Sequence, residues 1–177
     1  GALTLSGAMN LGAGGHQITV DNAMDTISGV ISGAGGITKA GTGTLTVTGA
    51  NTYSGGTTVS SGALLLGNNA ALGTGALTLT GGTLASSSTT ARTLANATTV
   101  TGDFTLGQAS GGTGALTLSG AMNLGAGGHQ ITVANTTDTI SGVVSGTGGI
   151  TKAGAGTLIL TGANTYSGGT TVSAGIL

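Results

Sequence analysis

The sequence contains no proline, no cysteine, no tryptophan and no glutamate. Without cysteine there is no disulfide framework. Only seven of the 177 residues carry a formal charge, whereas about a quarter of the residues of a typical soluble domain are charged. These residues are Lys39, Arg92, Lys152, Asp21, Asp25, Asp103 and Asp138. Because no lysine or arginine cluster exists to neutralise phosphates, we expect no nucleic-acid partner.

Long apolar runs are also absent. The longest such run is "ALLL", from Ala63 to Leu66, so no segment is expected to cross a membrane as a helix. No stretch shows capped apolar residues at helical spacing. The sequence opens and stops inside a repeat, and we therefore expect residues 1–177 to be a single segment of a longer chain.

Glycine, serine and threonine are abundant in this chain, whereas charged residues are scarce. Glycine occurs 39 times, 38% of the residues are hydrophobic, and the mean hydropathy is +0.41. Disorder requires low hydrophobicity, and here leucine, valine and isoleucine alternate with threonine and serine in short runs that end in glycine. This pattern predicts short strands joined by tight corners, and hence an all-β protein.

The chain contains an internal repeat. Residues 1–64 align without a gap with residues 114–177, and 54 of these 64 pairs are identical. The sequence therefore contains one complete unit, 1–113, and a partial second unit, 114–177. Strands of five or six residues with frequent glycine corners favour a solenoid with three short strands per coil, because each coil then only has to match its neighbours.

A coil of a parallel β-helix takes roughly 23–28 residues, so the unit is predicted to form four or five coils. We expect the unit 1–113 to be a whole number of coils. Equivalent residues would then occupy the same corner, roughly 19–24 Å apart along the axis. Alternation predicts that Leu45, Val47 and Leu158 face the core, and that Thr46 and Ile159 face water.

One stretch, "GGITKAGTGTLTVTGANTYSGGTTVSSGAL" from Gly35 to Leu64, resembles a known family. It is similar to the passenger-associated transport repeat of bacterial autotransporter passengers, and its second copy runs from Gly148 to Leu177, with Lys39 and Lys152 in place. The resemblance implies a right-handed parallel β-helix that is exported across an outer membrane. It also implies a repeat associated with efficient export and folding of the passenger, and it marks architecture and secretion rather than an activity.

Candidate catalytic and metal-binding residues are few. Glycoside hydrolysis commonly needs two carboxylates at a defined separation; Asp21 and Asp25 are close in sequence, but the second copy has Ala134 in place of Asp21. His16 and His129 are expected several coils apart, too far to share one metal ion. We therefore predict no enzyme, no catalytic or cofactor-binding residue, no metal site and no cofactor.

Three further patterns are weaker. Asn96 and Asn135 begin triplets that fit N-glycosylation, and Tyr53 and Tyr166 are expected to pack over corner glycines rather than to form a sugar-binding platform. Threonines that are predicted to face outward suggest ice binding as a further hypothesis. However, "TLTVT", "TLT" and "TVT" (44–48, 78–80 and 99–101) are unevenly spaced along the sequence, which argues against a regular array.

The sequence thus predicts a structural shaft or stalk segment of a secreted bacterial surface protein, either an adhesin or an extracellular fibre. The alternative is a binding module whose lateral face binds glycans or sister molecules; a contiguous exposed apolar or aromatic stripe would favour it. The partner classes that we expect are the chain itself, associating end to end or laterally, and a host or glycan surface.

Overall fold

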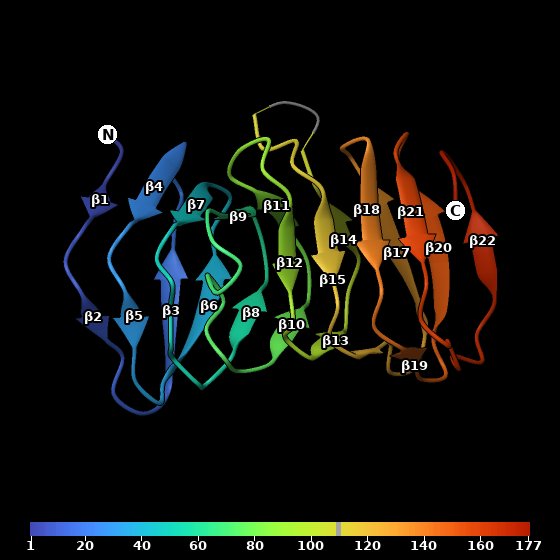
Figure 1. Ribbon diagram of the computed structural model, residues 1–177, viewed down its shortest axis with the longest axis horizontal. Coiled ribbons are helices and arrows are strands. Elements are labelled where there is room, and N and C mark those ends of the chain that lie inside the picture. The colour runs from blue at the N-terminus through green and yellow to red at the C-terminus, as the bar shows by residue number, and fades with distance from the viewer. Residues whose placement is uncertain (109–110) are drawn as a thin grey trace.

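The computed structural model describes residues 1–108 and 111–177 and is all-β over that range (Figure 1). Its strands are parallel and stack along one axis as a solenoid of about eight coils. The described residues contain no helix, and hence none that could span a membrane. The all-β solenoid predicted from the alternating pattern is confirmed.

One face of the solenoid is a nine-stranded sheet, here called the long sheet. Its strands, in order, are β1 (Thr4–Leu5), β4 (Met24–Ile27), β7 (Thr44–Val47), β9 (Ala63–Leu66), β11 (Thr83–Ser86), β14 (Phe104–Leu106), β17 (Gly128–Val133), β20 (Gly149–Ala153) and β22 (Thr170–Val172). Each strand adds one coil, so the hydrogen-bonded ladder runs from one end of the chain to the other.

A seven-stranded sheet forms the second face. It contains β3 (Gly15–Thr19), β6 (Gly36–Ala40), β8 (Thr57–Val59), β10 (Leu77–Leu79), β13 (Thr98–Val100), β16 (Met122–Asn123) and β19 (Val144–Ser145). The third face is interrupted. It starts as a two-stranded sheet of β2 (Met9–Asn10) and β5 (Ile31–Ser32), and ends as a four-stranded sheet of β12 (Arg92–Leu94), β15 (Leu116–Leu118), β18 (Thr137–Ile140) and β21 (Thr157–Leu160).

Most coils are shorter than predicted. On the long sheet, Thr44 pairs with Ala63, and Ala63 pairs in turn with Thr83; only the step from Phe104 to Ile131 has the predicted length. Tight glycine corners explain the difference. At Gly62, for example, φ is 65°, a conformation that residues with a Cβ rarely adopt, and it turns the chain sharply between β8 and β9.

The unit 1–113 is not a whole number of coils, and this expectation was wrong. In the seven-stranded sheet, five register steps lead from His16 through Ile37, Thr57, Leu77 and Thr98 to Met122. The residue equivalent to His16 is His129, which lies beyond Met122 by about a third of a coil. Equivalent residues consequently lie in different sheets, and the single corner and axis predicted for them do not exist.

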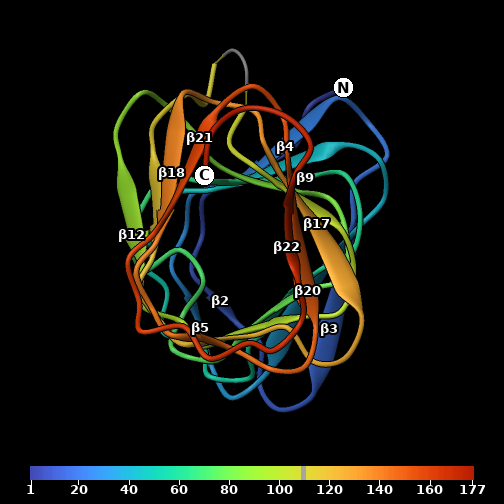
Figure 2. The ribbon, with the colours of Figure 1, turned by 90° about the vertical axis from the view of Figure 1, so that its right-hand side faces the viewer.

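The core is a continuous column of mainly aliphatic side chains inside the coils. The coils superimpose as a closed ring when viewed along the axis (Figure 2). Leu45 and Leu158 are both buried in it, and Ile159 is exposed, as predicted. Thr46 is only 9% exposed, however, so the prediction that it faces water was wrong. Its register neighbour Leu65 is buried as well, because the long sheet is covered on both faces at this point.

Candidate functional site

Two buried lysines are the most unusual polar feature of the solenoid. Lys39 and Lys152 are fully buried, and each directs its ammonium at a corner. Lys39 Nζ donates to the carbonyls of Ala40 at 2.7 Å, Gly41 at 3.0 Å and Ser61 at 3.2 Å. Ser61 belongs to the next coil, so the lysine ties two coils together.

The second copy reproduces this arrangement. Lys152 Nζ donates to Ala153 at 2.8 Å, Gly154 at 2.9 Å and Ala174 at 3.1 Å. All three N–H donors of each ammonium are thus used by backbone carbonyls. Burial lowers the pKa of both lysines, because desolvation disfavours the charged form. We call each arrangement a lysine clamp.

The sequence carries a signal for the lysine clamp, although no role was predicted for either lysine. In "GITKAG", period-2 alternation places Lys39 on the same face as Ile37, and Ile37 faces the core. A lysine at a core position needs acceptors for its ammonium. Here carbonyls at the corner supply them, although Ala40 O also accepts from Val20 N and Gly41 O also accepts from Ser61 Oγ.

Asn51 forms a second inter-coil contact. Its Oδ1 accepts from Ile31 N at 2.8 Å, and its Nδ2 donates to Ala71 O at 2.7 Å, so one buried side chain bridges the coils on either side. This bridge continues the third face beyond β5, because no strand lies on that face in the coils that contain Asn51 and Ala71. Asn164 repeats the acceptor half of the contact, with Val144 N at 2.9 Å.

Tyr53 is buried beside this bridge and packs against Gly73 of the next coil, while its hydroxyl contacts Thr57 Oγ1 at 2.6 Å. Desolvation raises the pKa of Tyr53 to about 12. Packing over a glycine is therefore confirmed for Tyr53. Tyr166 contacts Thr170 Oγ1 at 2.7 Å in the same way, but it is only partly buried.

Two equivalent aspartates, Asp25 and Asp138, form structural contacts. Asp25 Oδ1 accepts from Leu3 N at 2.8 Å and from Asn22 Nδ2 at 2.7 Å, and it thereby caps the strand of the preceding coil. Asp138 makes the same two contacts, with Leu116 N at 2.7 Å and Asn135 Nδ2 at 2.8 Å. Each carboxylate therefore acts as a strand cap.

Burial separates the pKa values of these two equivalent aspartates. The hydrogen bond from Asn22, followed by that from Leu3, lowers the pKa of Asp25. Asp138 is fully buried, and desolvation raises its pKa despite the hydrogen bonds from Leu116 and Asn135. Its Oδ2 and Asn135 Oδ1 are buried without a hydrogen-bond partner.

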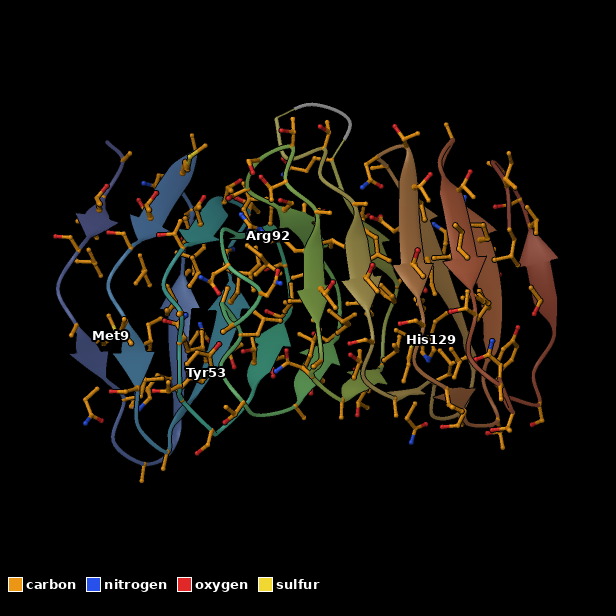
Figure 3. All side chains as sticks on the ribbon, viewed as in Figure 1. Met9, Tyr53, Arg92 and His129 are labelled. Carbon is orange, nitrogen blue, oxygen red and sulfur yellow. The ribbon has the colours of Figure 1, made fainter. Side chains whose placement is uncertain are left out.

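The histidines lie in different sheets, His16 on β3 and His129 on β17. Each contacts a backbone carbonyl through Nε2, Leu11 O at 2.5 Å and Leu124 O at 2.9 Å. No group of three or more potential metal ligands occurs in residues 1–108 and 111–177. Figure 3 shows Tyr53 and His129 far apart along the solenoid, so the fold does not bring these side chains together.

The surface of the described residues is only shallowly hollowed. Four of its hollows are lined mostly by threonine, glycine, asparagine and alanine, and Asp103 is the one carboxylate residue that lines any of these four. The amides of both glycosylation triplets are engaged: Asn96 Nδ2 donates to Gly73 O and Gly75 O, and Asn135 is buried. The geometry thus favours a structural role for these asparagines over glycosylation.

The segments that contain the lysine clamps match a known protein family. The model of the passenger-associated-transport-repeat matches residues 37–66 and 150–177. The chain carries two passenger-associated-transport-repeats. The first contains Lys39, Asn51 and Tyr53, and the second contains their equivalents, so the matched segments coincide with the inter-coil contacts described above. The resemblance of residues 35–64 to this repeat is confirmed.

A curated relative points the same way. The "Adhesin BmaC autotransporter" of Brucella suis biovar 1 (strain 1330) is 58% identical to this chain over 55 residues, which are 30% of this chain and 2% of the adhesin. The chain thus spans only a small part of the length of that relative. No solved structure matches the chain significantly. Together with the β-solenoid, these matches support an autotransporter passenger repeat domain, a family that implies secretion or a place at the cell surface.

Proposed function

We propose that this passenger repeat domain is a shaft segment that projects other parts of a bacterial surface protein away from the cell. The observation that carries the proposal is the uninterrupted nine-stranded ladder of the long sheet. A parallel ladder adds about 4.8 Å per coil. Its eight steps extend the chain by roughly 38 Å without any hinge.

The side-chain hydrogen bonds between adjacent coils support the same role. A solenoid is as strong as its weakest interface between coils, because each coil contacts only its neighbours. Lys39, Asn51 and Asp138 each connect adjacent coils by side-chain hydrogen bonds in addition to the ladder. Such contacts oppose fraying of single coils, and local fraying is what exposes a surface protein to proteases.

The alternative of a lateral binding module has less support. Its distinguishing feature would be a contiguous exposed apolar or aromatic stripe. Away from the first and last coils, the large exposed apolar side chains of the described residues are Met24, Val30, Val143 and Ile159. Val143 adjoins the seven-stranded sheet and Ile159 lies in the four-stranded sheet, so these two do not form one stripe. The end coils expose Leu3, Ile176 and other apolar residues, and association through the ends stays a prediction.

The shaft proposal is tested by changing the number of units. Proteins with one, two and three tandem copies of residues 1–113, each followed by residues 114–177, are compared by small-angle X-ray scattering. Each added unit, five and a third coils, should lengthen the particle by about 25 Å at constant cross-section. A matched control inserts the same residues in scrambled order. Added units that thicken or unfold the particle, or a segment that by itself adheres to cells, would contradict the proposal.

A further inference from the structure

The outward face of the seven-stranded sheet carries a regular array of hydroxyl groups. Thr38, Thr58, Thr78 and Thr99 are register partners on four successive strands, β6, β8, β10 and β13, which lie side by side in Figure 1. We call these four residues the first rank. Because the pairing is in register, each coil contributes one threonine at the same position.

A second rank runs parallel to the first, two residues further along each strand. It consists of Ser60, Thr80 and Thr101, whose amides continue the ladder to Lys39 O, Val59 O and Leu79 O. The pairs 78–80 and 99–101 are therefore in register on adjacent coils. Their uneven spacing in the sequence argued against a regular array, but the parallel pairing of β10 with β13 aligns them.

The array is regular in two directions. Neighbouring strands are about 4.8 Å apart, and residues two apart on a strand are about 6.6 Å apart. β-Branched threonine has few χ1 rotamers, and two hydroxyls of the second rank are held further. Ser60 Oγ donates to Lys39 O at 2.8 Å, and Thr80 Oγ1 donates to Val59 O at 3.1 Å. These oxygens are positioned and keep their acceptor lone pairs for a ligand.

The first rank, by contrast, has unused hydroxyls. Among the described residues, Thr38, Thr58, Thr78 and Thr99 form no side-chain hydrogen bond to the protein. Thr99 is exposed and the other three are partly buried. Each can therefore donate to and accept from a ligand above the sheet.

The surroundings of the array are flat and uncharged. The residues that precede the first rank by two positions are small, namely Gly36, Gly56, Ala76 and Ala97. The only charged residue on β6, β8, β10 or β13 is Lys39, whose side chain is buried. No aromatic side chain lies on these strands to stack on a sugar ring.

We propose that this hydroxyl face, defined as the first and second ranks together, binds ice. A rigid, flat, uncharged lattice of hydroxyl and methyl groups that repeats in both directions fits a ligand that is itself a lattice of hydrogen-bonded water. A single soluble glycan chain does not repeat in two dimensions. The proposal is independent of the shaft function, because the shaft rests on the ladder and the array rests on the side chains above it.

The test is ice-affinity partition of the purified 177-residue chain, with ice-crystal shape observed during slow growth. The wild-type chain should enter the ice and produce faceted crystals. The double variant Thr78→Lys/Thr99→Lys should lose both effects, because two long charged side chains would rise above the flat face. The matched control Thr117→Lys/Thr139→Lys adds the same charge to register neighbours of the four-stranded sheet and should retain both effects.

Three results would overturn the proposal. One is exclusion of the wild-type chain from ice. Another is a control variant that loses as much partition as the hydroxyl-face variant while its circular dichroism stays that of folded β-structure. The third is binding to microcrystalline cellulose without partition into ice, because the array would then serve a solid polysaccharide instead.

Discussion

Lys39 and Lys152 are equivalent residues of the repeat and form the same three carbonyl contacts, yet they lie in different sheets. Lys39 is on β6 of the seven-stranded sheet, and Lys152 is on β20 of the long sheet. The clamp is therefore a property of the local sequence and the next coil, whereas the face that carries it depends on the residues in between. A coil with three similar faces accepts the same segment in more than one phase.

The lysine clamp should be worth more inside the solenoid than at its end. Lys39→Met leaves Ser61 O without its ammonium donor and removes one of the donors of Ala40 O and of Gly41 O. We expect the free energy of unfolding to fall by about 3 kcal/mol. Lys152→Met acts on Ala174, which lies in an exposed stretch of the last coil, where water can replace the donor, and it should cost about 1 kcal/mol. Urea denaturation of both variants measures the difference. Equal losses would contradict the burial argument.

The phase shift between the repeats can be tested with cysteines, because the chain has none of its own. Thr99 and Asn123 are register partners on β13 and β16, close enough for a disulfide. The variant Thr99→Cys/Asn123→Cys should therefore crosslink under mild oxidation, as seen by mass spectrometry. Asn10 is equivalent to Asn123 but lies in the two-stranded sheet, so Thr99→Cys/Asn10→Cys should not crosslink within one molecule. A whole-coil repeat would give no Thr99–Asn123 bridge.

The contributions of Asp25 and Asp138 to the free energy of unfolding should change with pH in opposite directions. A folded-state pKa below the unfolded value adds stability above the unfolded pKa, and this stability is lost as the pH falls. Asp25→Asn should therefore be more harmful at pH 7 than at pH 3. For Asp138 the folded-state pKa is raised, so the ionised form costs stability as the pH rises through that pKa. Asp138→Asn should become relatively more favourable from pH 3 to pH 7.

Urea denaturation of wild type and both asparagine variants at pH 3 and pH 7 measures how the effect of each substitution on the free energy of unfolding changes with pH. Asparagine keeps an acceptor for the capped amide in each case, so the comparison isolates the charge. If the effect of the substitution changed with pH in the same direction in both variants, burial would not distinguish the two caps.

Glycine corners set how closely the coils approach. A Cβ added at Gly29 would overlap the carbonyl oxygen of Gly7 in the preceding coil, whereas a Cβ at Gly7 meets nothing within 4 Å. Gly29→Ala should lower the free energy of unfolding by about 3 kcal/mol or prevent folding. Gly7→Ala should be close to neutral. Thermal unfolding followed by circular dichroism checks both, and tolerance of Gly29→Ala would mean that this corner can open.

The alternating pattern determined the solenoid and most of its core. Leu45 and Leu158 face inward because period-2 alternation is a local property of a strand. The pattern also contained Lys39 at a core position, although a lysine there is interpretable only once its carbonyl acceptors are known.

Only the tertiary structure decided coil length, phase and the partners across coils. Each coil is closed by the register it adopts with the previous one, so the sum of corner lengths, and not the repeat length, determines which face a residue joins. The stacking of the coils also explains why Thr46 is buried. It aligns Thr78–Thr80 with Thr99–Thr101 although these pairs are irregularly spaced along the sequence. The sequence determined which way each strand faces, and the stacking of the coils decided what it meets there.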